Sequence, residues 1–261
     1  MSILKVSKLT KSFGGLTAVS NVNIDIKSGE LVGLIGPNGA GKTTVFNLLT
    51  GIYAPDSGNI VLTKGDNEIS LQGLKPYAIC KSGLARTFQN IRLFKELSVL
   101  DNVRISMHKN VQYSLLSGML HLKSYTQEEK RLFDQSVELL KIFKLDHKMN
   151  EQAKNLPYGE QRHLEIIRAL ATDPVLLLLD EPAAGMNPAE TAQLTETIAW
   201  IRKNFNLTIL LIEHDMALVM KICERIYVLD YGMVIANGTP SEIKANKRVI
   251  EAYLGEDVEN A

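Results

Sequence analysis

The residues best suited to chemistry form the run Gly-Pro-Asn-Gly-Ala-Gly-Lys-Thr, which extends from Gly36 to Thr43. This run matches the pattern G-x-x-x-x-G-K-[ST], which predicts a loop whose backbone N–H groups surround a phosphate. A continuously apolar run over 31–35 precedes it and a helical pattern over 43–49 follows, so a helix N-terminus would add its positive end. A chance glycine-rich turn is the alternative, and the flanking strand and helix disfavour it.

Each part of this loop has an expected role. The side chain of Lys42 is expected to reach the β- and γ-phosphates, and the hydroxyl of Thr43 to bind Mg²⁺. The residues predicted to bind the nucleotide phosphates are Asn38, Gly39, Ala40, Gly41, Lys42, Thr43 and Thr44.

Acidic residues follow two other apolar runs. Asp180 and Glu181 directly follow the run over 175–179, and Glu213 and His214 directly follow the run over 208–212. Asp180 is expected to hold Mg²⁺ largely through water, because this small ion keeps part of its hydration shell. Glu181 is placed to polarise an attacking water, and His214 to position the γ-phosphate and that water. A solvated acidic pair is the alternative for Asp180 and Glu181, and the phosphate loop disfavours it. A structural role is the alternative for His214, which differs from the other histidines of the chain only by its position after this strand.

Strand and helix patterns place these residues on one scaffold. Short strands alternate with helices on both sides of the middle of the chain, which predicts an α/β fold with a mainly parallel sheet. Residues 3–6 and 22–26 predict an additional N-terminal β part, with one solvated face in the second run. Residues 90–165 have helical spacing and predict an inserted helical subdomain within a single domain covering 1–261.

Within this insertion two helices are predicted. One covers 105–125, and the other begins near Thr126, where Thr126 and Glu129 resemble a capping box. The second helix is expected to bury one face, formed by Phe133, Val137, Leu140 and Phe143.

The composition restricts the class of partner. The chain has 261 residues, with Lys+Arg and Asp+Glu equal at 29 each. A balanced charge argues against nucleic acid as a partner, because binders of nucleic acid usually carry a basic excess. No apolar run is long enough to span a bilayer, and the start lacks the apolar core of a signal peptide. We therefore expect the chain in the cytosol, with membrane association only through a partner.

The order of these motifs resembles the ATP-binding subunits of ABC transporters over essentially the whole chain. The motifs that carry the resemblance are Phe13, the phosphate loop, Gln89, the segment 156–161 (Leu-Pro-Tyr-Gly-Glu-Gln), the segment 179–182 (Leu-Asp-Glu-Pro) and the segment 213–215 (Glu-His-Asp). The resemblance implies the ABC ATPase fold, with ATP and Mg²⁺ bound and ATP hydrolysed. It further implies that Glu181, His214, Gln89 and Lys42 are catalytic, and that Gln89 joins Thr43 and Asp180 at the metal.

Other roles also come from the resemblance. Phe13 is expected to stack on adenine, with Ala18 near the base, and Gly159 to contact the γ-phosphate of an opposite subunit in trans. The segment 183–187 corresponds to a loop that crosses the dimer interface. The sequence departs from the usual L-S-G-G-Q signature, because Pro157 replaces the serine and Tyr158 the first glycine. Pro157 has neither a hydroxyl nor an N–H, so one expected phosphate contact is absent.

Four segments are similar to one branch of the family, the LivG-type ATPase subunits of branched-chain amino acid importers: 85–94, 179–188, 211–216 and 229–232. This resemblance implies a second ABC ATPase subunit, identical or different, two transmembrane permease subunits and, indirectly, an external solute-binding protein. The chain would then lie at the cytoplasmic face of the cell membrane, held there by the permeases. Other amino acids, urea or amides are alternative solutes.

Three other functions share part of this pattern. A soluble ABC ATPase of DNA repair or translation usually has two cassettes or long coiled-coil arms, and neither pattern occurs here. An exporter or lipid-related ATPase is disfavoured by the four branch-specific segments. A small-molecule kinase shares the phosphate loop but not the signature segment.

Overall fold

The computed structural model describes residues 1–108, 111, 119 and 123–259, and the chain divides into two compact units. The first, here called the sheet unit, comprises Met1–Arg86 and Val175–Ala261. The second, here called the helical unit, comprises Thr87–Pro174. The helical unit includes the predicted insertion at 90–165 and extends beyond both of its ends. That the two units work as one domain stays a prediction.

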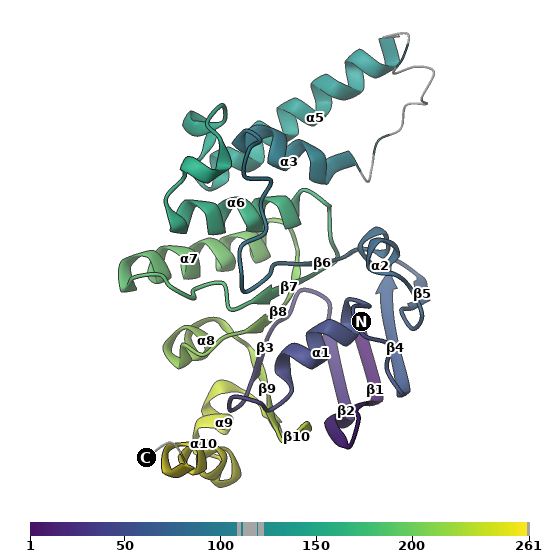
Figure 1. Cartoon of the computed structure of the whole chain (residues 1–261), viewed down its shortest axis with the longest axis vertical. Helices are drawn as coiled ribbons and strands as arrows, with labels where there is room; N and C mark the ends of the chain where they lie inside the picture. The colour runs from purple at the N-terminus through teal and green to yellow at the C-terminus, as the bar shows by residue number, and fades with distance from the viewer. Residues whose placement is uncertain (109–110, 112–118, 120–122, 260–261) are drawn as a thin grey trace. The chain divides into compact units, whose positions relative to one another are not determined.

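The sheet unit contains two β-sheets, which Figure 1 shows with their connecting helices. A four-stranded antiparallel sheet has the order β2-β1-β4-β5, and a six-stranded sheet has the order β10-β9-β3-β8-β7-β6. In the larger sheet only β10 pairs in the antiparallel sense, so the predicted mainly parallel sheet with an antiparallel N-terminal part is confirmed. The strands are β1 Ser2–Phe13, β2 Leu16–Lys27, β3 Leu31–Ile35, β4 Ser57–Lys64, β5 Asn67–Ser70, β6 Leu84–Arg86, β7 Leu176–Asp180, β8 Thr208–Ile212, β9 Arg225–Asp230 and β10 Met233–Gly238.

Burial along these strands follows from their sequences. Every residue of β3, β7 and β8 is buried, as continuously apolar parallel strands require when both faces are covered. By contrast, β2 alternates: Val22, Ile24 and Ile26 are buried and the residues between them are exposed. This confirms the predicted solvated face of that strand.

Helices connect the strands of the sheet unit. In Figure 1, α7 and α8 lie on one side of the six-stranded sheet and α1 lies on the other. The Asn187 side chain caps α7 in a capping box with Glu190, and the Asp215 side chain caps α8 directly after His214. The helices are α1 Lys42–Leu49, α2 Pro76–Ser82, α7 Pro188–Asn204, α8 Met216–Ile222, α9 Pro240–Ala245 and α10 Lys247–Glu259.

The helical unit is built from α3 Val99–Met107, α5 Lys123–Ile142 and α6 Tyr158–Leu170, with short 3-10 turns at Asp146–Lys148 and Ala153–Asn155. The capping box predicted at Thr126 is wrong, because α5 already includes Lys123 and Thr126 lies inside the helix. The predicted apolar face is confirmed at Leu140 and Phe143, which are buried. It is wrong at Phe133, which is exposed, whereas the neighbouring Leu132 is buried. Of the helix predicted over 105–125, residues 109–110, 112–118 and 120–122 lie outside the described residues.

None of the helices within the described part of the chain combines the length and the apolar character that a membrane-spanning helix needs.

Candidate active site

Three neighbouring parallel strands end at one edge of the six-stranded sheet. β3 pairs with β8, and β8 pairs with β7. The phosphate loop follows β3, Glu213 and His214 follow β8, and β7 ends at Asp180 with Glu181 directly after it. Ligands of open α/β sheets bind outside the carboxyl ends of such strands. The strand order therefore brings three separate sequence segments to one place.

The phosphate loop has a backbone shape that requires glycine at two positions. Gly36 has φ 149° and Gly41 has φ 100°. A Cβ atom would lie 2.0 Å from the Leu229 carbonyl oxygen at Gly36, and 2.5 Å from the Ala18 carbonyl oxygen at Gly41. Gly41 is also the N-cap of α1 and has no side chain to occupy the first-turn N–H groups, which leaves this helix end suited to an anion.

Lys42 lies folded over this loop. Its ammonium donates hydrogen bonds to the carbonyl oxygens of Gly36, at 2.6 Å, and Pro37, at 2.7 Å. The side chain is buried, so its positive charge is held at the loop in a medium where electrostatic interactions are stronger than in water. Asn38, Gly39 and Thr43 are exposed, whereas Ala40 is buried. This arrangement suits the predicted binding of phosphates.

Asp180 is held by an arginine that the sequence reasoning missed. The guanidinium of Arg86, in β6, donates to Asp180 Oδ2 at 2.7 Å, and the side chains of Arg86 and Asp180 are only 6% and 4% exposed. The same guanidinium donates to Asn47 Oδ1 at 2.7 Å and Thr50 Oγ1 at 3.3 Å, both in or directly after α1. Arg86 therefore ties the end of β7 to the helix that follows the phosphate loop. A signal was present in the sequence, since Arg86 lies inside the branch-specific segment 85–94.

The donors at this edge suit Mg²⁺. The described residues contain no group of three or more His, Cys, Asp or Glu side chains that could enclose a metal. Mg²⁺ does not need such a cage, because it is usually bound by one or two carboxylates, several waters and substrate phosphates. The Asp180 carboxylate and the Thr43 hydroxyl are oxygen donors of that kind, so the predicted ligand set fits the ion.

Glu181 and His214 form a pair across two strand ends. Glu181 Oε1 and His214 Nε2 are 2.6 Å apart, and the Glu181 side chain is 12% exposed. Glu181 has φ 48°, a value uncommon for a residue other than glycine, and its N–H donates to the Ile212 carbonyl oxygen at 2.9 Å. The strained backbone of Glu181 thus turns its carboxylate toward the histidine at the end of β8.

Glu213 fixes the turns on both sides of this pair. Its Oε1 accepts from the Ala183 N–H at 2.7 Å, and its Oε2 accepts from the His214 N–H at 3.1 Å. Burial raises the pKa of the Glu213 carboxyl above its ordinary value, and the backbone hydrogen bonds oppose that rise. The sequence marked Glu213 only as part of a motif, whereas the structure shows it joining the segments after β7 and β8.

The two residues predicted near the base lie on the antiparallel sheet. Phe13 ends β1, is 42% exposed, and packs edge-on against the ring of Tyr53 with centroids 5.1 Å apart. Ala18 lies in β2, and its carbonyl oxygen is adjacent to Gly41 of the phosphate loop. Phe13 therefore retains exposed ring surface, and base stacking on it stays a prediction.

Gln89 and Gly159 belong to the helical unit, where one buried arginine connects their segments. Arg162, in α6, donates to the carbonyl oxygens of Phe88 at 2.6 Å and Gln89 at 2.7 Å. It also pairs with Glu165 at 3.0 Å, and Glu165 Oε1 accepts from the Phe88 N–H at 3.3 Å. The structure thus ties the Gln89 segment to the helix that carries Gly159. Sequence reasoning missed both Arg162 and Glu165.

Gly159 lies in the first turn of α6. The N-cap of this helix is Pro157, which makes no side-chain hydrogen bond to the first turn. Tyr158, which replaces the usual glycine, accepts a hydrogen bond from Arg162 at its hydroxyl, at 3.2 Å. The helix end is therefore uncapped by a side chain, as the predicted contact with a phosphate in trans requires.

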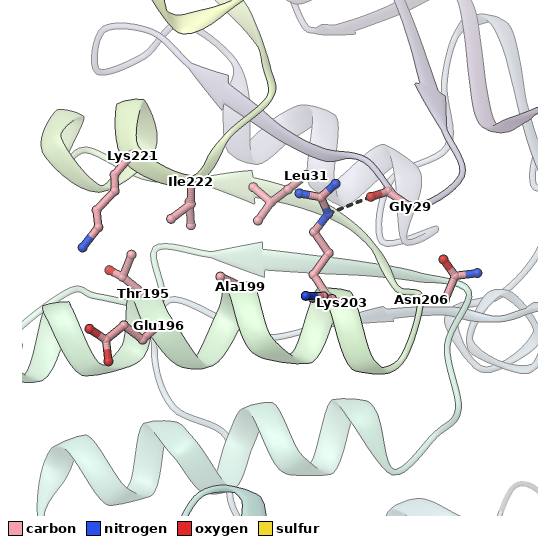
Figure 2. A pocket seen from close by; sticks show the side chains of 10 residues that line it. Gly29, Leu31, Thr195, Glu196, Ala199, Lys203, Asn206, Lys221 and Ile222 are labelled. Atoms are coloured by element: carbon pink, nitrogen blue, oxygen red, sulfur yellow. Dashed lines mark hydrogen bonds between the residues drawn. The ribbon is translucent and has the colours of Figure 1, made fainter.

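A separate groove of about 600 Å³ lies in the sheet unit (Figure 2). Ala199 and Lys203 of α7 line it together with Lys221 of α8, and the guanidinium of Arg202 donates to the Gly29 carbonyl oxygen at 2.7 Å. The groove contains none of the predicted site residues. It is therefore distinct from the edge at which the phosphate loop, Asp180 and Glu181 meet.

Comparison with known proteins agrees with this geometry. Residues 19–184 match the ABC transporter family, and residues 233–259 match the family described as branched-chain amino acid ATP-binding cassette transporter. The chain is 49% identical to the high-affinity branched-chain amino acid transport ATP-binding protein LivG of Escherichia coli over 97% of this chain and 98% of that protein. It is 46% identical to BraF of Pseudomonas aeruginosa over the same shares, and 37% identical to the lipopolysaccharide export ATP-binding protein LptB of Escherichia coli over 98% and 99%.

Solved structures support the same assignment. The ADP conformation of MJ1267, an ATP-binding cassette of an ABC transporter, is similar with a TM-score of 0.82 at 30% identity, over 98% of this chain and 99% of that one. A nucleotide-free cassette from an ABC transporter has a TM-score of 0.81 at 29% identity, over 97% and 99%. The phosphate loop, the acidic strand ends and these likenesses together show that the chain belongs to the family of ABC transporter ATP-binding proteins.

Proposed function

We propose that this chain binds and hydrolyses ATP to energise an importer of branched-chain amino acids. The observation that carries the proposal is the shared strand edge, where the phosphate loop, Asp180, Glu181 and His214 meet in one unit. The 49% identity to LivG supports the choice of solute class. Leucine, isoleucine and valine are the proposed solutes, and they would be bound by the partner subunits rather than by this chain.

Nucleotide binding rests on the phosphate loop. Its backbone N–H groups and the N-terminus of α1 would hold the β- and γ-phosphates, and Lys42 would exchange its two carbonyl partners for phosphate oxygens. Thr43 and Asp180 would hold Mg²⁺, with Gln89 as a further ligand. The ion supplies neutralisation of the charge that develops on the phosphoryl oxygens.

Catalysis rests on Glu181 and His214. Glu181 would accept a hydrogen bond from the attacking water and orient it in line with the γ-phosphate. The 2.6 Å contact with His214 holds the Glu181 carboxylate in position before substrate arrives. Preorganised groups of this kind lower the barrier because they need no reorientation during the reaction.

Coupling to transport requires partners. A second ABC ATPase subunit would supply Gly159 of its own signature, or its equivalent, to the γ-phosphate bound here, so that ATP favours the closed dimer over the open one. Two permease subunits would contact the helical unit at the cytoplasmic face of the membrane, and an external solute-binding protein would deliver the solute. Hydrolysis then removes the phosphate that bridges the dimer.

Reconstitution in proteoliposomes tests this proposal. Proteoliposomes that contain the chain, its partner ATPase and the permeases, supplied with the solute-binding protein, are expected to take up labelled leucine. Uptake should require ATP on the side of the membrane that carries the ATPase subunits, and Lys42→Ala should abolish it. Uptake of urea or of an unrelated amino acid instead would overturn the solute class. Absence of ATP hydrolysis by the complex would overturn the catalytic assignment.

A further inference from the structure

The turn between β9 and β10 reaches the phosphate loop although it lies outside every motif of the site. Asp230 pairs with Met233, so the turn has two residues, Tyr231 at φ 41° and Gly232 at φ 77°. Positive φ at both positions is the signature of a type I′ hairpin turn. Tyr231 is 79% exposed, whereas Gly232 packs against two other segments.

Gly232 makes backbone hydrogen bonds to both of those segments. Its N–H donates to the Ala40 carbonyl oxygen of the phosphate loop at 3.0 Å, and its own carbonyl accepts from the Ser20 N–H of β2 at 2.8 Å. A Cβ atom at Gly232 would lie 2.7 Å from the Ala18 carbonyl oxygen and 3.2 Å from the Val19 Cα. These are backbone atoms, which cannot move aside as a flexible side chain would.

The bond to Ala40 determines the orientation of one peptide group of the phosphate loop. In a planar trans peptide the C=O of one residue and the N–H of the next point in opposite directions. Because Gly232 holds the Ala40 C=O, the Gly41 N–H is directed away from the β9–β10 turn. Gly41 is one of the residues whose N–H groups are expected to bind phosphate.

The same turn also positions the segment near the predicted base. The Ala18 carbonyl oxygen lies between Gly41 and Gly232, since a Cβ atom on either glycine would approach it within 2.7 Å. The phosphate loop, Ala18 and the turn therefore share one closely packed contact. A displacement of the turn would move both ends of the nucleotide site relative to each other.

We propose that Gly232 is a positioning residue for the nucleotide: it orients the Gly41 N–H toward the phosphates and sets the distance between the phosphate loop and the base-side strand β2. Gly232 does not touch the nucleotide in this proposal but acts through Ala40 and Ala18. The inference rests on the proposed function, because it assumes that ATP binds at the phosphate loop.

A second hairpin of the sheet unit offers a matched control. Lys64 pairs with Asn67 across the two-residue turn between β4 and β5, where Gly65 has φ 61°. A Cβ atom at Gly65 would meet nothing within 4 Å. Replacement by alanine thus imposes similar backbone strain at both turns, but only at Gly232 does it also displace other segments.

The experiment is equilibrium binding of ATP with Mg²⁺ to the full chain, by calorimetry, for wild type, Gly232→Ala and Gly65→Ala. Gly232→Ala is expected to raise the Kd about tenfold, equivalent to about 1.4 kcal/mol, and Gly65→Ala by less than about twofold. In steady-state assays Gly232→Ala should raise KM for ATP, while kcat stays within about threefold because Glu181 and His214 follow other strands. Equal Kd values for the two variants overturn the inference. A rise in KM without a fall in kcat distinguishes a positioning role from a general loss of stability, which would reduce the active fraction and therefore kcat.

A measurement on the wild-type chain covers the case in which Gly232→Ala does not fold. Amide hydrogen exchange at Gly232 and Ser20 is expected to slow when ATP binds, whereas exchange at Gly65 should not change. An unchanged exchange rate at Gly232 in the ATP complex overturns the inference while the proposed function stands. A wild-type chain that binds no ATP overturns both.

Discussion

The two units each contain a buried arginine that makes several hydrogen bonds, but the two arginines hold different kinds of group. In the sheet unit, Arg86 holds the side chain of Asp180, which is itself a candidate metal ligand. In the helical unit, Arg162 holds the backbone carbonyls of Phe88 and Gln89. The sheet unit thus places reacting side chains directly, whereas the helical unit fixes the path of a segment.

The two kinds of restraint suit different functions. Side chains at the ends of β7 and β8 are restrained by neighbouring strands, which suits chemistry that depends on fixed distances. The Gln89 segment is restrained through α6. We therefore expect a displacement of α6 to move the Gln89 segment, because Arg162 and Glu165 join the two. Variants in the sheet unit should therefore alter turnover, and variants in the helical unit should alter coupling.

The largest expected effect is on turnover in the sheet unit. Glu181→Gln keeps the size of the side chain and its contact with His214 but removes the charge that polarises water, so kcat should fall about 10²–10⁴-fold. ATP binding should persist, which predicts a trapped ATP-bound dimer in gel filtration. Glu196→Gln, an exposed glutamate of α7 in the groove of Figure 2, is the control. Wild-type turnover by Glu181→Gln would remove Glu181 from the mechanism.

Arg86→Met should affect stability and turnover together. Removing one partner of a buried ion pair is strongly destabilising and costs about 3–5 kcal/mol of unfolding free energy. Because Asp180 loses its positioning contact, kcat should also fall at least about tenfold at temperatures where the variant is folded. Chemical denaturation and ATPase assays measure the two effects, and unchanged turnover in the folded variant would contradict a positioning role for Arg86.

Arg162→Met is the matched change in the helical unit. The pair of Arg162 and Glu165 has side chains 0% and 5% exposed, so its disruption should cost a similar free energy of unfolding. The Kd for ATP should stay within about twofold, since the phosphate loop belongs to the sheet unit, while stimulation of ATPase activity by permeases should be lost. Loss of ATP affinity equal to that of a phosphate-loop variant would erase the proposed distinction between the units.

Phe13→Ala should have a smaller effect, confined to nucleotide affinity. Aromatic stacking contributes about 0.5–1.5 kcal/mol beyond area burial, so the Kd for ATP should rise about two- to tenfold with little change in maximal rate. Phe13→Trp should retain affinity because it keeps an aromatic face. A collapse of the rate at saturating ATP would show that Phe13 acts in the chemistry rather than on the base.

The smallest expected effect is a pH dependence of stability from the helical unit. Burial raises the pKa of the Glu165 carboxyl above its ordinary value of 4.5, despite opposing hydrogen bonds and the charge of Arg162. Between 4.5 and the raised pKa the unfolded chain binds fewer protons than the folded chain, so the free energy of unfolding should decrease as pH rises. Glu165→Gln should flatten this slope in urea unfolding measured at several pH values. An identical slope in wild type and Glu165→Gln would contradict the prediction.

Much of the site was predictable because its signals are local. The phosphate loop is a contiguous run whose glycines, lysine and threonine each have a physical task, and Asp180 and Glu181 directly follow an apolar strand. The parallel sheet was equally predictable, since β3, β7 and β8 are short apolar runs separated by helices. Helix boundaries in the helical unit were less predictable. Thr126 resembled an N-cap because a threonine followed three residues later by a glutamate also occurs inside helices, and helix ends are the least certain part of an element.

The candidate residues for the chemistry can be predicted from the sequence alone, because their types and spacing follow from the requirements of the ligand and the reaction. The residues that hold them in place become evident only from the folded chain. Arg162 belongs to none of the motifs, and Arg86 and Gly232 lie in segments marked only by resemblance to one branch of the family. Their hydrogen bonds join residues far apart in the chain: Arg162 and Gln89 are 73 positions apart, Arg86 and Asp180 are 94 apart, and Gly232 and Ser20 are 212 apart. Such pairings depend on strand order and on close backbone approach, and neither is encoded in any contiguous segment.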